Sequence, residues 1–308
     1  MSIAAAFPDE RWIYDLVLPP AVDDRLVWHY TNVEGLLGIL GGHAFHATSV
    51  LMLNDSVEFR HGVSLIEEQW ATTAAHYSHA PAMDALLRTA AAVLPLQNLF
   101  VVCSSTGEKS LSQFRAYGSY AVGINPGMRL RARLPAGGSP DAVGRNIDEI
   151  YANTAFDDGW RQVLYSDSEK REHITRLFDA LDRLCDGWPS DDDTIGRAHA
   201  LAQVWYNQAV AYMKHEAFAD EREVRLTGNL PSYSPAVQLR SARLGIAPFV
   251  QVETMPTPGM RANLLAPIRE VRLGPGLADP PAALAGVQYA AQKLGYNIEV
   301  NTIDTPLR

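Results

Sequence analysis

The stretch LVWHYT at residues 26–31 places polar side chains within an apolar, strand-like run. Successive side chains of a strand point to opposite faces. We therefore expect His29 and Thr31 on one face, and Trp28 and Tyr30 on the other. A titratable side chain on a strand, among hydrophobic neighbours, indicates a cleft rather than a solvated loop.

Two later stretches have the same mixture of apolar and polar residues: LSQFRAYG at residues 111–118 and EREVRL at residues 221–226. In the second of these, strand alternation predicts that Glu221, Glu223 and Arg225 share one face. The three stretches are far apart in the sequence. A site that uses all of them needs a sheet that brings them together.

The composition is that of an ordinary globular protein, with 47% hydrophobic and 20% charged residues among 308. The formal net charge of −9 argues against affinity that rests on broad contacts with nucleic-acid phosphates. The two cysteines, Cys103 and Cys185, make neither a disulfide framework nor a zinc site by themselves, and they fit a reducing compartment. The N-terminus lacks a signal-peptide pattern, and no apolar run approaches the roughly 20 residues that span a bilayer, so we expect a cytoplasmic protein without a membrane partner.

Hydrophobic periodicity and turn residues predict a chain that alternates strands with helices. Asn32 is a suitable N-cap for the first helix, and Gly41 and Gly42 are suitable for its end. The stretch at residues 111–117 reads as the connection of a β-hairpin that leads into the strand at 120–124. The expected strands are residues 26–30, 44–49, 98–104, 120–124, 221–226, 249–252, 268–273 and 297–303. The expected helical segments are 33–40, 57–89 with a break near 78–81, 147–151, 160–164, 174–184, 195–215 and 281–294.

This order of elements predicts an α+β fold with a twisted, mixed or antiparallel sheet. We expect one domain over residues 25–308, with residues 140–218 as a helical insertion within it. Residues 1–24 are expected to form an N-terminal lead-in.

The chemistry of the third stretch depends on its two carboxylates. A carboxylate held on a strand in a partly dry cleft stabilises a developing positive charge. Glycosidic bonds break through an oxocarbenium-like state that carries such charge, and the nicotinamide–ribose bond of NAD breaks in the same way. Glu223 can fill this role, and Glu221 can orient the nucleophile. The alternative is a surface ion-pair ladder that contributes less than about 1 kcal/mol.

The other two stretches supply candidate binding groups. His29 can donate to a ribose hydroxyl or a phosphate, an aromatic ring can stack on nicotinamide or a base, and Arg115 can hold a pyrophosphate or a carboxylate. A satisfied core histidine, packed tyrosines and a structural salt bridge are the competing interpretations. The candidate cofactor-binding residues are His29, Tyr30, Thr31, Ser112, Gln113, Arg115 and Tyr120, and Tyr117 joins Glu221 and Glu223 as a candidate catalytic residue.

Other chemistries lack their motifs. Ser112 has no nucleophile-elbow setting, and neither a P-loop nor a dinucleotide-binding glycine pattern occurs. The histidines at 43, 46 and 61 lie near Asp55 and Glu58 in the sequence, but their spacing matches no standard metal-ligand pattern. A metal-dependent hydrolase that uses Asp55 and Glu58 stays open as a third possibility, although no metal is predicted.

Four groups of residues resemble a widespread bacterial family, the domain of unknown function 2971. They are HYT at 29–31 with LNDSVEFRHG at 53–62, LSQFRAYGSYAVG at 111–123, KHEAFADEREVRL at 214–226, and VRLGP at 271–275. The resemblance runs from about residue 26 to residue 308. This family name implies no activity.

A looser similarity links three spots of the chain to ADP-ribosyltransferases. It rests on His29-x-Thr31, the hydroxyl or tyrosine stretch around Ser112 and Tyr117, and the late Glu221-x-Glu223 pair. The similarity implies a split, bent β-structure with NAD in its cleft, His29 on the adenosine side, Glu223 as the catalytic glutamate and Glu221 as the accessory residue. The middle stretch departs from the usual Ser-Thr-Ser, and the helical insertion is long.

The sequence thus predicts an NAD-consuming enzyme that transfers ADP-ribose to a protein, a nucleic acid or water. Such an enzyme would act as a toxin or in phage defence. The alternative is a non-catalytic module that binds nucleotides or nucleic acid. The enzyme interpretation requires His29, Tyr117 and Glu223 to converge in one cleft.

Overall fold

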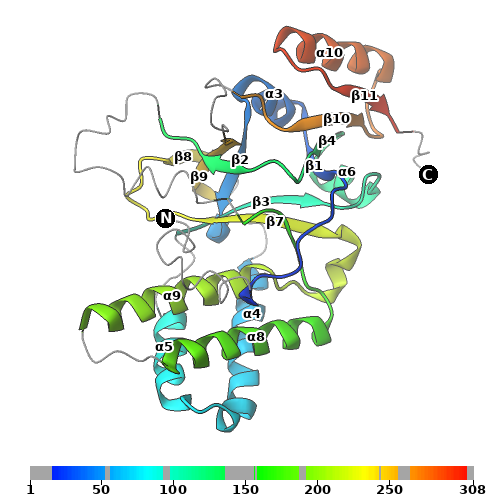
Figure 1. Cartoon of the computed structure of the whole chain (residues 1–308). Helices are drawn as coiled ribbons and strands as arrows, with labels where there is room; N and C mark the ends of the chain where they lie inside the picture. The colour runs from blue at the N-terminus through cyan, green and yellow to red at the C-terminus, as the bar shows by residue number, and fades with distance from the viewer. Residues whose placement is uncertain are drawn as a thin grey trace.

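The computed structural model describes residues 16–52, 56–92, 98–135, 156, 158–186, 192–242, 244–255 and 264–303, without the side chains of 56–59, 192–195 and 197. The chain has a mixed α+β fold with an open mixed sheet. Figure 1 shows four long helices, α4, α5, α8 and α9, on one side of the sheet, and α3 and α10 on the other. The expected α+β class is therefore correct.

The described strands are β1 Val27–Thr31, β2 Ala44–Ser49, β3 Leu99–Ser105, β4 Tyr120–Ile124, β5 Leu130–Ala132, β6 Arg161–Gln162, β7 Glu223–Asn229, β8 Val237–Ala242, β9 Gly245–Thr254, β10 Ile268–Leu273 and β11 Glu299–Thr302. The α-helices are α3 Val33–Gly42, α4 Ser56–Thr73, α5 Ala80–Ala92, α6 Leu111–Tyr117, α8 Asp167–Asp186, α9 Asp192–Ala211 and α10 Pro280–Lys293. A 3₁₀ segment, η5, covers Glu216–Glu221.

Strand β3 is the centre of the sheet. It pairs with β7 along its whole length, so β7 occupies one of its two edges. Strands β1 and β2 therefore share the other edge. Trp28 of β1 pairs with Ser105, and Thr48 and Ser49 of β2 pair with Val101 and Phe100. The two strands thus diverge along β3, with α3 connecting them. All pairings between the described strands are antiparallel except that of β10 with β11.

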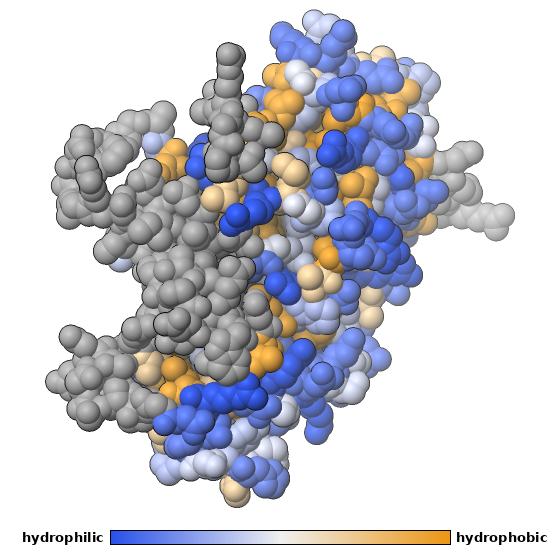
Figure 2. Space-filling model, viewed as in Figure 1, coloured by the Kyte–Doolittle hydropathy of each residue, from blue (hydrophilic) through white to orange (hydrophobic). Residues whose placement is uncertain are grey.

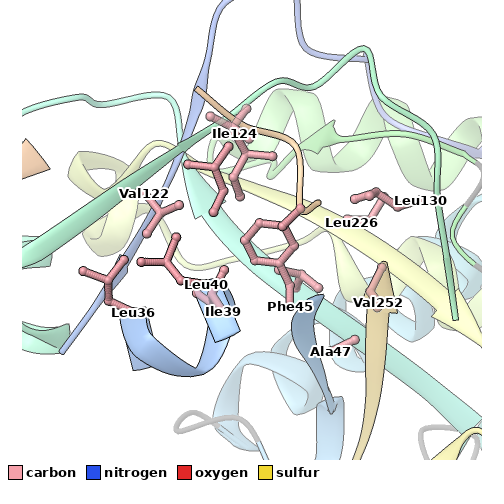
Figure 3. Packing of buried hydrophobic residues seen from close by; sticks show 14 of the residues in the cluster. Leu36, Ile39, Leu40, Phe45, Ala47, Val122, Ile124, Leu130, Leu226 and Val252 are labelled. Atoms are coloured by element: carbon pink, nitrogen blue, oxygen red, sulfur yellow. The ribbon is translucent and has the colours of Figure 1, made fainter. Parts of the chain in front are cut away.

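The apolar run of β3 explains why it is central. Phe100 and Val102 belong to the core under α3 and α10, and Leu99 and Val101 belong to the core under the four long helices. A strand that is buried on both faces needs apolar residues at successive positions rather than at alternate ones. Figure 3 shows the first of these cores, where side chains from α3, β2, β4 and β7 pack together.

The start of α3 follows the sequence prediction, whereas its end differs, because Gly41 and Gly42 are the last helical residues rather than the cap. The Asn32 side chain accepts a hydrogen bond from the backbone N–H of Gly35 at 2.8 Å, and His43 closes the helix in the left-handed region. Gly118 joins α6 to β4 with φ of +124°, and a Cβ there would lie 2.7 Å from the backbone of Asn32. Glycine is therefore required where this connection crosses the start of α3.

Three predictions about the elements are wrong. The strand at 98–104 and the strand at 120–124 do not form a β-hairpin, because β1 lies between β3 and β4 and pairs with both. Residues 111–117 form helix α6, because Ser110 caps it by accepting from the Gln113 N–H at 3.3 Å and because helical spacing buries Gln113 and Phe114. Residues 160–164 are extended rather than helical, since β6 pairs with β7 and Leu164 bridges to Met213. The segment predicted at 147–151 lies outside the described residues.

The predicted insertion at 140–218 supplies α8 and α9, which pack against α4 and α5 and enclose the second core. These helices therefore form one layer with helices from the preceding part of the chain. On the face in Figure 2, hydrophilic residues cover most of the described surface, and apolar side chains lie between them in small groups.

Candidate functional site

A buried group of charges lies at the start of β7. Glu223 is 7% exposed, and its carboxylate accepts from Arg225 Nε at 2.7 Å and Nη2 at 3.0 Å. Lys214 Nζ, from the segment after α9, donates to Glu223 Oε2 at 2.9 Å and to Glu221 Oε2 at 2.6 Å. Both oxygens of Glu223 are therefore engaged by cations.

These cations determine the charge state of Glu223. Burial by itself raises the pKa of this carboxyl, but the charges of Arg225 and Lys214 outweigh burial and lower the pKa to about 2. Glu223 is therefore ionised at neutral pH. Its charge is already balanced within the protein, which limits what it can give to a substrate.

Glu221 is the more accessible carboxylate, with its side chain 21% exposed. The prediction that it continues the strand face of Glu223 and Arg225 is wrong. Glu221 ends η5, and Arg222 follows in the left-handed region at φ of 45°, so the chain turns before β7 begins. Lys214 nevertheless brings the two carboxylates together.

Two tyrosines border this charge group. The hydroxyl of Tyr165 accepts from the Glu223 backbone N–H at 2.8 Å, and burial raises its pKa. Tyr117, at the end of α6, is 45% exposed, and α6 packs against η5. Burial raises the pKa of Tyr117 to about 12, and the charges of Glu221 and Glu223 contribute to this shift. Tyr117 thus forms the exposed wall of the site.

Tyr30 has a positioning role in this structure. Its hydroxyl donates to the Gly107 carbonyl at 2.5 Å and accepts from the Ser110 N–H at 3.0 Å. Its ring packs edge-to-face on Phe114 with centroids 4.8 Å apart. Tyr30 therefore fixes the start of α6. On that helix Ser112 and Arg115 are exposed, whereas Gln113 is buried.

His29 lies one strand away from the charge group. Its Nδ1 is 2.8 Å from the carbonyl oxygen of Cys103, a residue of β3 between the positions that pair with β1 and with β2. The ring therefore fills the gap where these strands diverge. Burial lowers the pKa of His29, so it is neutral at pH 7.

The register of β1, β3 and β7 divides the predicted residues between two faces. Trp28 pairs with Ser105, and Ser105 pairs with Glu223, so these three side chains share one face. Strand alternation then places His29 on the opposite face. Thr31 and Tyr120 pair with each other on that opposite face, and Tyr120 is buried in the core under α3. The structure thus brings Tyr117, Glu221 and Glu223 together and leaves His29, Thr31 and Tyr120 apart from them. The predicted convergence of His29, Tyr117 and Glu223 in one cleft is therefore wrong, because the register of β3 places His29 on the other face of the sheet.

Sequence reasoning missed three members of the site. Lys214 bridges the two glutamates, Tyr165 binds the start of β7, and the thiol of Cys103 lies against Glu223. Burial raises the pKa of Cys103 well above its ordinary value, with a contribution from Glu223. A lysine directly after the apolar run VAYM, close to two glutamates, was the available signal.

The metal alternative stays a prediction, because Asp55 and the side chain of Glu58 lie outside the described residues. Among the side chains that the structure describes, no group of three or more His, Cys, Asp and Glu residues is placed to hold a metal ion.

Comparison with known proteins gave no match to a family model, a curated protein or a solved structure. The resemblance to the domain of unknown function 2971 therefore rests on the motifs alone. Within the described ranges, no helix combines the length and apolarity needed to cross a membrane.

Proposed function

We propose that the chain is an ADP-ribosyltransferase-like enzyme that cleaves the nicotinamide–ribose bond of NAD, and that Glu221 is the carboxylate that faces the substrate. The observation that carries the proposal is the partly exposed Glu221 beside the exposed ring of Tyr117, with Lys214 bonded to its Oε2 at 2.6 Å. This arrangement provides a fixed carboxylate and an aromatic surface at one opening.

The proposed reaction breaks the bond between ribose C1′ and the nicotinamide nitrogen. The bonding electron pair leaves with neutral nicotinamide, and the ribose becomes an oxocarbenium ion. Glu221 orients the attacking hydroxyl or water and accepts its proton as the new bond to C1′ forms. Tyr117 stacks on the nicotinamide ring. Glu223 acts as a positioning residue, because it holds Lys214 and thereby Glu221.

The divergence of β1 and β2 from a shared edge of β3 also supports this proposal, since ADP-ribosyltransferases are expected to have a split β-structure. His29 stands at that divergence. In the proposal His29 keeps the gap in shape through its bond to Cys103 and does not contact NAD, so the cleft is formed by Tyr117 and Glu221 without the predicted contribution of His29.

The acceptor of ADP-ribose is a protein, a nucleic acid or water. A role as a toxin or in phage defence is part of the same proposal. A non-catalytic nucleotide-binding or nucleic-acid-binding module is the second candidate, and the saturation of Glu223 by two cations favours it. A fully balanced carboxylate is typical of a structural ion pair.

Nicotinamide release from NAD by the purified protein separates the two candidates. We expect release with the unmodified chain and a loss of at least about 100-fold in Glu221→Gln, the scale of removing a group that acts in the transition state. Glu270→Gln is the control, because Glu270 is, like Glu221, a mostly buried glutamate whose carboxylate is bonded to a cation, but it lies on β10. Nicotinamide release by Glu270→Gln should stay within about twofold of that by the unmodified chain, once the rate is divided by the fraction of the variant that is folded.

Three outcomes of this experiment distinguish the enzyme from the binding module. Release that is lost in Glu221→Gln and kept in Glu270→Gln supports the enzyme. Binding of NAD without release, tested with added protein, DNA and RNA, supports the binding module. Equal release from Glu221→Gln and the unmodified chain removes Glu221 from the reaction.

A further inference from the structure

A cavity lies in the helical layer of the structure. It has a volume of about 620 Å³ and lies between α4, α8 and the start of η5. Figure 1 shows α4 and α8 in the same layer, and Gln69 of α4 donates to the Arg171 carbonyl of α8 at 3.1 Å. Small-molecule sites have volumes of roughly 300–1,000 Å³, so this cavity has room for a ligand of that class.

Three basic side chains from three segments meet at one end of the cavity. Lys170 of α8 is 2% exposed, and its Nζ lies 3.5 Å from His61 Nε2 of α4. The ring of His61 lies 5.7 Å, centroid to centroid, from that of His215, which precedes η5. In the Lys170–His61 contact the ammonium donates to Nε2 of a neutral His61, and an anion between the two side chains would replace this bond with charge-assisted ones.

The counter-charge of Lys170 within the protein is easily displaced. Asp167 Oδ1 lies 3.0 Å from Lys170 Nζ, but the Asp167 side chain is 75% exposed. An exposed carboxylate gains little from such a pair and can turn into solvent. This differs from the charge group on β7, where the two carboxylates that share Lys214 are 7% and 21% exposed.

The hydrogen-bond donors at this end suit an anion. His215 Nδ1 accepts from the Ala217 N–H at 3.1 Å, so the neutral ring carries its proton on Nε2. Burial lowers the pKa of His61, followed by the charge of Lys170 and by His215, so an anion would favour its protonation. The remaining charged residues that line the cavity are Glu68 and Arg171 on the helices and Glu216 on η5.

The rest of the cavity is lined by uncharged side chains, some apolar and some with an amide or a hydroxyl group. Leu65 and Ile174 supply apolar surface, and Gln69, Thr72 and Thr73 supply polar groups. A bare inorganic anion would leave this part unused, whereas an organic group attached to the anion would cover it.

We propose that this cavity is a binding site for a small phosphate ester, with Lys170, His61 and His215 around the phosphate and Leu65 and Ile174 under the organic part. The residues that line this cavity include none of those assigned to the proposed NAD site, although His215 directly follows Lys214 in the chain.

Isothermal titration of the whole chain with ribose 5-phosphate tests the proposal, with inorganic phosphate as the second probe. We expect the ester to bind more tightly than phosphate, and Lys170→Met to weaken ester binding by at least about tenfold, the loss expected for one charge-assisted contact. Lys293→Met, which changes an exposed lysine on α10, is the matched control and should leave affinity unchanged.

His61→Gln serves as a second variant in case Lys170→Met does not fold, and it should weaken binding in the same direction. The titration measures ester binding directly, which keeps this test independent of NAD turnover. Absence of binding by either probe, or equal affinity of Lys170→Met and Lys293→Met in folded protein, overturns the site. Equal affinity for phosphate and the ester overturns the ester assignment.

Discussion

The same four residues, Glu-Val-Arg-Leu, occur on two strands of this sheet, at 223–226 on β7 and at 270–273 on β10. In both places the arginine binds the glutamate two positions earlier through Nε and Nη2. The distances are 2.7 and 3.0 Å on β7, and 2.6 and 3.2 Å on β10. The same four residues on a strand therefore produce the same ion pair twice.

The surroundings of the two pairs differ. Arg225 is 2% exposed and Lys214 adds a second cation to its glutamate, so the β7 pair is closed from solvent. Arg272 is 17% exposed, stacks over the Trp28 ring at 4.3 Å and also binds Glu108, whose side chain is half exposed. The four-residue motif therefore determines the ion pair between its glutamate and its arginine. The neighbouring elements determine how far the pair is buried and whether another carboxylate, such as Glu221 on η5, lies beside it.

The sharpest way to test this comparison is to remove each arginine. Arg225→Met leaves Glu223 buried with Lys214 as its remaining described cation, and we expect a loss of about 3–5 kcal/mol in the free energy of unfolding. Arg272→Met acts on a more exposed pair, and we expect a loss of about 1–2 kcal/mol. Urea denaturation at pH 7 measures both. Equal losses in the two variants would show that burial around the pair does not change its contribution to the free energy of unfolding.

Acid should weaken the contribution of the β7 ion pair to the free energy of unfolding. The pKa of Glu223 is lowered from 4.5 to about 2 in the folded chain, so its contribution is fully present above pH 4.5 and is lost as the pH falls toward 2. The whole contribution is about 3 kcal/mol at roughly 1.4 kcal/mol per pKa unit. Urea denaturation between pH 5.5 and 3.5 should show the stability gap between the unmodified chain and Glu223→Gln shrinking with acid. A gap that stays constant would contradict the lowered pKa.

The smallest effect is expected at the uncharged partner of the β10 pair. Asn301 Nδ2 donates to Glu270 Oε1 at 3.1 Å, and Arg272 already satisfies this carboxylate. We expect Asn301→Ala to cost about 1 kcal/mol, because one hydrogen bond to a charged group near solvent is lost. Thermal unfolding detects such a change, and a loss as large as that of Arg225→Met would remove the distinction between the two regions.

Much of the fold could be predicted from local signals. The cap at Asn32, the glycine-ended helix, the apolar run of β3 and the strand–helix–strand close at β10, α10 and β11 follow from residues within a few positions of each element. The helix at 111–117 could not be predicted in this way, because its seven residues also fit the connection between two strands. The packing of Phe114 against Tyr30, from a distant strand, decides between them.

The candidate site was predicted in part. Glu221 and Glu223 do lie together, but η5 and Lys214 bring them together rather than strand alternation. His29 was expected in the same cleft, and the register of β3 places it on the other face. Strand register depends on pairing partners far along the chain, which a single sequence does not reveal.

The position of β3 has a consequence for biosynthesis. Its edges are satisfied by β1 and β2, made before it, and by β7, which is complete only when the ribosome has reached Asn229. At about 5–20 residues per second, the apolar run of β3 waits for several seconds with one edge open. An apolar, β-branched segment with a free edge is prone to pair with other chains. The nascent chain is therefore expected to need chaperone protection during the synthesis of the intervening helices.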